Sequence, residues 1–174
     1  MQALFRSALF GLVLLMTAVF AQQQVPLPGA SVIGSGTFRW FGLTLYEATL
    51  FADRDSFNAD TWANAPLALE LAYTRSLAGD KIAVASTDEM KKLGVGNAAQ
   101  LRAWDMAMKQ IFPTVNEGTR LTGVYRPGQP TRFLLNGDPL GEIADPAFGP
   151  AFFAIWLNPD TSAPKLRSAL LGKR

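Results

Sequence analysis

The first part of the chain carries the apolar and polar pattern of β-strands. Residues 31–40 and 43–52 are two β-prone runs, separated by a Phe-Gly pair that is typical of a tight turn. Residues 66–75 alternate apolar and polar side chains with a period of two, which is the period of a strand with one buried face. These patterns predict three antiparallel strands.

The middle of the chain changes to a helical period. Residues 79–93 place apolar side chains at helix-compatible spacing, and Gly94 ends the pattern. Asn97 is a residue type favoured at helix starts, and the apolar stripe that follows it runs until Pro113. We therefore predict two helices. We interpret the stripe of the second helix as core, because amphipathic helices normally bury such stripes.

Strand patterns return in residues 119–127, 131–137 and 139–145. Residues 146–157 are apolar on nearly every side, which is typical of a helix packed between a sheet and other helices, and residues 163–172 form a final short helix. The order is three strands, two helices, three strands and two helices. It predicts an α+β fold with the helices packed on one side of an antiparallel sheet.

The N-terminal segment has the pattern of an export signal. One positive charge, Arg6, precedes an apolar run over residues 8–20, and the small residues Val19 and Ala21 stand where a signal peptidase reads them. The run is shorter than the ~20 residues that a bilayer span needs. We interpret residues 1–21 as a signal peptide.

The remainder of the chain fits one domain of ordinary size. Residues 22–30 contain two prolines and a glycine and are predicted to be an extended lead-in, and residues 31–174 form the single domain. After cleavage the protein is expected in the periplasm or secreted, with no membrane span.

The composition of the chain excludes several kinds of site. The whole chain has 16 basic and 14 acidic residues, so loss of Arg6 leaves 15 minus 14, or +1, and the basic residues are scattered. No nucleic-acid partner is expected from this pattern. Cysteine and histidine are both absent, which excludes a disulfide, a thiol nucleophile, a Cys or His zinc site and a Ser-His-Asp triad. We expect no metal and no cofactor, although a haem held by tyrosine or methionine stays open.

The first hairpin combines polar groups that suit a binding site. A two-residue turn at Phe41 and Gly42 pairs Arg39 with Thr44 and brings an arginine and three hydroxyl-bearing residues onto one face. The predicted ligand-binding residues are Thr37, Arg39, Thr44 and Tyr46. Such a cluster either meets only water, as polar sheet faces usually do, or binds a carboxylate or phenolate ligand. Both interpretations stay open.

The same register also defines an apolar face. It pairs Trp40 with Leu43 and Thr37 with Tyr46. The apolar set on the opposite face, predicted to pack under the helices, is Phe38, Trp40, Leu43 and Leu45.

Several stretches together resemble the chalcone isomerase-like families. The opening hairpin resembles theirs in its glycine-x-glycine, arginine, tyrosine and apolar pattern, in the stretch VIGSGTFRWFGLTLYEATLFA. Later blocks resemble the bacterial exported branch in the same order: LRAWDMAMKQIFPTVNEGTRLTGVYRPG, FLLNGDPLGEIADPAFGPAFFAIWL and TSAPKLRSALLG. The resemblance covers roughly residues 31–172. It implies an open-faced β-sandwich with a ligand cleft between the helices and the sheet.

Family members differ in function, so the resemblance alone does not select one. The plant enzymes close a chalcone into a flavanone, whereas related branches bind fatty acids. Arg39 corresponds to the enzymes' catalytic arginine if one extra residue separates it from Gly36. Tyr46 stands where the enzymes have threonine and the fatty-acid-binding relatives have tyrosine, and the enzymes' later tyrosine and asparagine have no counterpart. Isomerase chemistry is therefore disfavoured.

Three functions follow as hypotheses. The first is a non-catalytic binder of a small apolar ligand with an anionic or polar end, of fatty acid or phenolic type. The second is an isomerase of the intramolecular lyase type, in which Arg39 stabilises an enolate or phenolate and Tyr46 orients it. The third is a scaffold or partner-binding protein without a pocket. An internal cavity that reaches Arg39 would favour the first two, and a filled interior the third.

Overall fold

The computed structural model describes residues 26–173, and its centre is one six-stranded antiparallel sheet. Strands follow one another in chain order across the sheet, from edge strand β1 to edge strand β6. They are β1 (Ser31–Trp40), β2 (Leu43–Ala52), β3 (Leu67–Tyr73), β4 (Arg120–Tyr125), β5 (Thr131–Leu135) and β6 (Asp138–Ile143). Each strand pairs with its neighbour in sequence, so the sheet is a simple meander.

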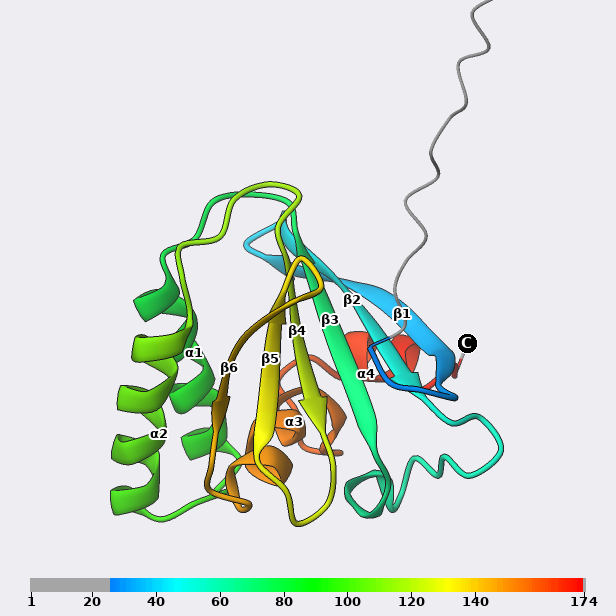
Figure 1. Cartoon of the computed structure of the whole chain (residues 1–174). Coiled ribbons are helices and arrows are strands. Elements are labelled where there is room, and N and C mark those ends of the chain that lie inside the picture. Colours follow the sequence, from blue (N-terminus) through cyan, green and yellow to red (C-terminus); the bar gives the residue numbers. More distant parts are fainter. Residues whose placement is uncertain (1–25, 174) are drawn as a thin grey trace, which may run out of the picture.

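Helices cover one face of this sheet. They are α1 (Gly79–Lys92), α2 (Ala98–Ile111), α3 (Phe148–Leu157) and α4 (Pro164–Leu170), and a short 3₁₀ helix, η1 (Trp62–Asn64), precedes β3. In Figure 1, α3 and α4 lie behind the sheet, and α1 and α2 lie side by side next to β6. The predicted order of elements and the α+β fold class are both confirmed.

The core lies between the sheet and α3. Three aromatic residues of α3 recur every fourth position, Phe148, Phe152 and Trp156, and all three are buried. Because residues four apart share one face of a helix, these rings form a single stripe. Phe152 also meets Phe133 of β5 edge to face, with ring centroids 5.4 Å apart. The aromatic stripe therefore fixes α3 against the middle of the sheet.

The glycine-x-glycine motif of β1 is explained by close packing of α4. A Cβ added at Gly34 would lie 2.2 Å from the carbonyl oxygen of Ala169, and one added at Gly36 would lie 2.8 Å from the Cβ of Ala169. Any side chain at either position would force the helix away from the strand. The motif is thus a packing requirement of this fold.

Some predictions concern residues outside the described part of the chain. The predicted signal peptide, residues 1–21, lies there, together with most of the predicted lead-in. The end of the lead-in that is described is a turn, with a hydrogen bond from the Ala30 nitrogen to the Leu27 oxygen, so it is not extended. Within residues 26–173, no helix is long and apolar enough to cross a membrane.

Candidate functional site

The first hairpin forms, but its register differs from the prediction. The predicted pairs Trp40–Leu43 and Arg39–Thr44 are confirmed. Beyond them the register shifts, because a β-bulge in β2 leaves Leu45 without a partner. Phe38 therefore lies opposite Tyr46, and the predicted Thr37–Tyr46 pair is wrong.

The bulge separates the four predicted site residues. Tyr46 stacks on Phe38 with ring centroids 5.1 Å apart, on the face that the helices cover. Arg39 follows Phe38 in the strand, so its side chain points to the opposite, open face, where it is exposed. Thr37 is also exposed, opposite Glu47, and Thr44 is half-buried beside Arg39. The predicted polar cluster of Thr37, Arg39, Thr44 and Tyr46 on one face is wrong.

Arg39 has no partner that would hold it in a site. Within residues 26–173 no hydrogen bond or ion pair joins its guanidinium to another residue. The backbone carbonyl of Thr44 accepts hydrogen bonds from Thr74 Oγ1 and Arg75 Nε, each at 2.9 Å. Arg39 thus lies on a solvated sheet surface, as the simpler of the two interpretations expected.

The apolar set of the hairpin is divided in the same way. Phe38 packs against the core, but Trp40 and Leu43 are 57% and 53% exposed, so the prediction that they lie under the helices is wrong. These two side chains are exposed because the hairpin is longer than the neighbouring strand β3. The last pair between β2 and β3 is Tyr46 with Tyr73, so the end of the hairpin extends past the rest of the sheet.

Tyr46 belongs instead to a cluster of hydroxyl and indole groups, in which Tyr73 and Trp156 are buried and Tyr46 is partly buried. Trp156 Nε1 donates a hydrogen bond to the Tyr46 hydroxyl at 3.0 Å, and the rings of Tyr46 and Tyr73 lie 5.7 Å apart. Burial raises the pKa of both tyrosines well above the ordinary range, and the negative charge of Glu89 raises the pKa of Tyr46 further. Both phenols are neutral at physiological pH, and Tyr46 acts as a hydrogen-bond acceptor.

The space between the sheet and α3 is filled. A gap of only about 10 Å³ lies there, bordered by the side chains of β3, β4, β5 and α3, among them Phe133, Phe152 and Trp156. That volume is about one water molecule. The ligand cleft implied between helices and sheet is therefore closed by large aromatic side chains, and this gap does not reach Arg39.

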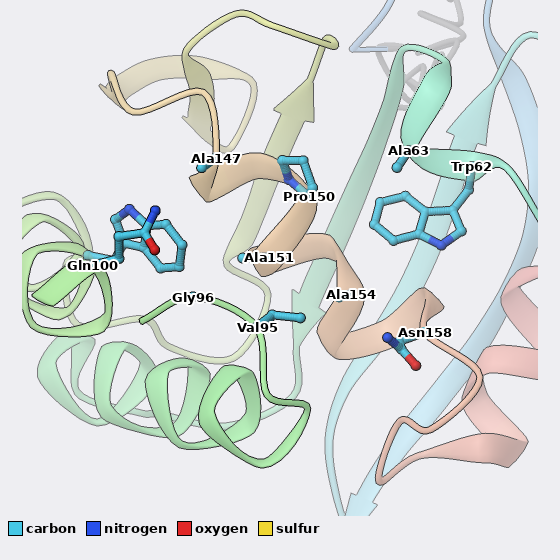
Figure 2. A pocket seen from close by; sticks show the side chains of 11 residues that line it. Trp62, Ala63, Val95, Gly96, Gln100, Ala147, Pro150, Ala151, Ala154 and Asn158 are labelled. Carbon is cyan, nitrogen blue, oxygen red and sulfur yellow. The ribbon is translucent and has the colours of Figure 1, made fainter. Parts of the chain in front are cut away.

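A larger space lies on the other side of α3. It is a surface groove of about 350 Å³ between α3, η1 and the start of α2 (Figure 2). Most of its lining is apolar: Trp62, Val95, Trp104, Pro150, Ala151 and Ala154. Trp104 is held in place by a hydrogen bond of 2.9 Å from its Nε1 to Asp145 Oδ2. This groove is the candidate functional site.

Two amide side chains provide the polar part of the groove. Gln100 Oε1 accepts a hydrogen bond from the Asn97 backbone nitrogen at 3.0 Å, and Asn158 Oδ1 accepts one from the Asp160 nitrogen at 2.8 Å. Because the fold occupies an oxygen of each amide, the NH₂ groups are left as the donors for a ligand. Figure 2 shows Gln100 and Trp62 on opposite sides of α3, and Asn158 at the C-terminal end of this helix. No residue of the lining is ionisable.

No sequence pattern predicts this groove. The apolar stripe of α2, which includes Trp104, predicts a core face, and the stripe is indeed largely core. The available signal was a row of small side chains, Ala147, Ala151 and Ala154, on a helix whose other side chains are mainly large and aromatic. Such a row indicates a hollow only once the neighbouring elements are in place.

The chain belongs to the chalcone isomerase-like family, whose sequence model matches residues 16–172. An uncharacterized protein of Haemophilus influenzae is 28% identical over 141 residues, which covers 81% of this chain and 67% of that protein. The crystal structure of the Arabidopsis thaliana fatty-acid binding protein AtFAP1 is similar with a TM-score of 0.63 at 13% sequence identity, covering 83% of this chain and 87% of that one. The predicted fold is confirmed by these comparisons.

Proposed function

We propose that this protein is a non-catalytic binder of a small, mainly apolar ligand with a polar end, and that the groove outside α3 holds the ligand. The groove itself carries the proposal. Its volume of about 350 Å³ lies at the lower end of the range of small-molecule sites, and such sites combine apolar walls with a few polar groups. The fold is also that of the Arabidopsis thaliana fatty-acid binding protein AtFAP1, which supports this class of ligand.

The free donors of the groove indicate the polar end of the ligand. Gln100 and Asn158 offer N–H groups, so they suit a carboxylate, phenolate or carbonyl oxygen. Trp62 is half-buried and offers flat apolar surface for an alkyl chain or an aromatic ring, whereas Trp104 is only 2% exposed. A fatty acid or a phenolic compound fits both requirements. Export to the periplasm or out of the cell is part of the proposal, and N-terminal sequencing that finds Gln22 first would support it.

The isomerase hypothesis and the scaffold hypothesis differ in how well the site supports them. The isomerase hypothesis needs Arg39 and Tyr46 to act on one substrate, and they lie on opposite faces of the sheet. The scaffold hypothesis gains support from the tight packing between the sheet and α3, because the gap of about 10 Å³ there is too small for a ligand. Binding in the outer groove and a scaffold role differ in one measurable respect, which is the affinity for a small molecule.

Isosteric variants test the groove without disturbing the fold. Asn158→Asp and Gln100→Glu keep the oxygens that accept from the backbone and replace each NH₂ donor by a second oxygen. We expect each to weaken binding of laurate or a trihydroxychalcone at least tenfold, since a lost donor to a charged group costs about 1.5–3 kcal/mol. Titration calorimetry measures the affinity, after native mass spectrometry has identified any retained ligand.

The chain offers a matched control for this experiment. Asn58 accepts a hydrogen bond from the Asp60 nitrogen at 2.8 Å, the same local turn that Asn158 forms with Asp160, and Asn58 lies outside the groove lining. Asn58→Asp should leave affinity unchanged. Equal affinities for wild type, Asn158→Asp and Gln100→Glu would remove the groove from the proposed function and leave the scaffold hypothesis.

A further inference from the structure

The turn between β1 and β2 exposes a compact group of large apolar side chains. Phe41 is 89% exposed, and Trp40 and Leu43 are each more than half exposed. The rings of Trp40 and Phe41 meet edge to face with centroids 5.2 Å apart. The turn lies past the last β2–β3 pair, at the end of the sheet where the β3–α1 and α2–β4 connections also lie (Figure 1). We call residues 39–44 the hairpin tip.

The backbone of the hairpin tip indicates that Phe41 does not stabilise the fold. Phe41 and Gly42 both have positive φ, 47° and 78°, as in a two-residue turn of type I′. The first position of such a turn favours Asn, Asp or Gly, and a bulky side chain there is strained. A side chain as exposed as that of Phe41 gains little packing energy in return. The strained aromatic residue therefore points to a partner outside the domain.

Two arginines give the hairpin tip its charge. Arg39 is the one charged residue within residues 39–44, and the Arg75 guanidinium is fixed beside the tip by the hydrogen bond from its Nε to the Thr44 carbonyl. The acidic residue of the hairpin, Glu47, lies further in, opposite Thr37. An apolar apex with cations at its base matches the layered chemistry of a lipid surface, where phosphates lie above acyl chains.

We propose that the hairpin tip is an anchor that binds the surface of an anionic phospholipid bilayer. Trp40, Phe41 and Leu43 enter the boundary between headgroups and acyl chains, and Arg39 and Arg75 contact the phosphates. The exposure of these side chains favours lipid, because apolar groups on an exposed turn enter a soft layer without the preformed socket that a protein partner would need. A single small anchor gives weak and reversible binding. This inference is independent of the ligand groove.

Tryptophan fluorescence tests the anchor in the full chain. The chain has four tryptophans, and none precedes Trp40, so any change in fluorescence comes from tryptophans within residues 40–156. Vesicles of phosphatidylglycerol and phosphatidylethanolamine with brominated acyl chains should quench the fluorescence of the wild type. Trp40→Tyr should abolish most of that quenching. An unquenched wild type, or full quenching in Trp40→Tyr, would overturn the proposal.

Phe41→Asn separates a lipid anchor from a structural role. Asparagine before Gly42 is the preferred pair for this turn, so the variant keeps the hairpin and relieves its strain. We expect vesicle affinity to fall at least tenfold, because the variant loses a large apolar side chain that enters the lipid, while the melting temperature stays equal or rises. Met106→Gln is the matched control, because Met106 is 61% exposed on α2, and it should bind vesicles like the wild type.

A separate variant tests the role of the positive charge in the anchor. Arg39→Gln should weaken binding to phosphatidylglycerol vesicles about fivefold, and it should not change binding to neutral phosphatidylcholine vesicles. Unchanged vesicle affinity in both Phe41→Asn and Arg39→Gln would overturn the proposal. So would a change of oligomeric state in Phe41→Asn without vesicles, because the tip would then be an interface between copies of the chain. Groove variants such as Asn158→Asp should bind vesicles normally.

Discussion

The two sides of α3 differ in the size of their side chains and in the volume of the space beside them. Toward the sheet, Phe148, Phe152 and Trp156 recur every fourth residue and leave a gap of about 10 Å³. On the groove side, the small residues Ala147, Ala151 and Ala154 border a space of about 350 Å³. One helix thus closes the cleft on its inner side and leaves a groove on its outer side. The comparison teaches that the position of a pocket in this fold depends on side-chain size, since the backbone is shared by both faces.

The strongest way to break this comparison is to open the inner side. Phe152→Ala removes a ring that meets Phe133, Phe148 and Trp156, with ring centroids 5.2 to 5.4 Å away. We expect the free energy of unfolding to fall by about 3–5 kcal/mol, because a large cavity replaces the ring. Urea denaturation measures the loss. A loss below about 1 kcal/mol would mean that the inner side is loosely packed and could admit a ligand as it stands.

The buried hydroxyl cluster gives the next largest effect. Tyr46→Phe leaves the buried Trp156 Nε1 without its acceptor, which should cost about 1–3 kcal/mol. Because burial raises the folded-state pKa of Tyr46 above its ordinary value of 10.0, the neutral phenol stabilises the fold below that pH, and this contribution is lost as the pH rises further. The wild type should therefore lose more stability than Tyr46→Phe between about pH 8 and about pH 11.

Urea denaturation at the two pH values measures this difference. Tyr73, which is also buried with a raised pKa, remains in both proteins, so Tyr46→Phe should reduce the alkaline loss without abolishing it. Identical pH dependence in the two proteins would place the Tyr46 hydroxyl in contact with solvent.

A large side chain in the groove on the outer side of α3 tests the comparison further. Of the changes proposed, it should have the smallest effect on stability. Ala147 lines the groove and is exposed, so Ala147→Trp should change the free energy of unfolding by less than about 0.5 kcal/mol while it blocks ligand binding. Ala144→Trp is the control, because Ala144 is exposed and outside the groove lining. Calorimetric titration with laurate compares the two variants, and equal affinities would show that the ligand lies elsewhere.

The order and type of the elements were determined by the sequence alone. Alternating and helical periods are local properties, so the strands that became β1 to β6 and the helices that became α1 to α4 could be identified in their correct order. The glycine-x-glycine motif was visible in the sequence as well. Only the structure shows its cause, which is the close approach of α4 to Gly34 and Gly36.

The site, in contrast, was decided by tertiary contacts. The bulge at Leu45 turns Tyr46 toward Trp156, which lies 110 residues further along the chain, and no local pattern around the hairpin contains that information. The same shift removes Tyr46 from the open face, where Thr37, Arg39 and Thr44 remain, so the predicted cluster of four polar residues does not form. The groove depends likewise on three distant elements, α2, α3 and η1, that meet only in the folded protein. A sequence period fixes which face a residue takes within its own element, whereas a pocket depends on which elements pack together and on the size of the side chains between them.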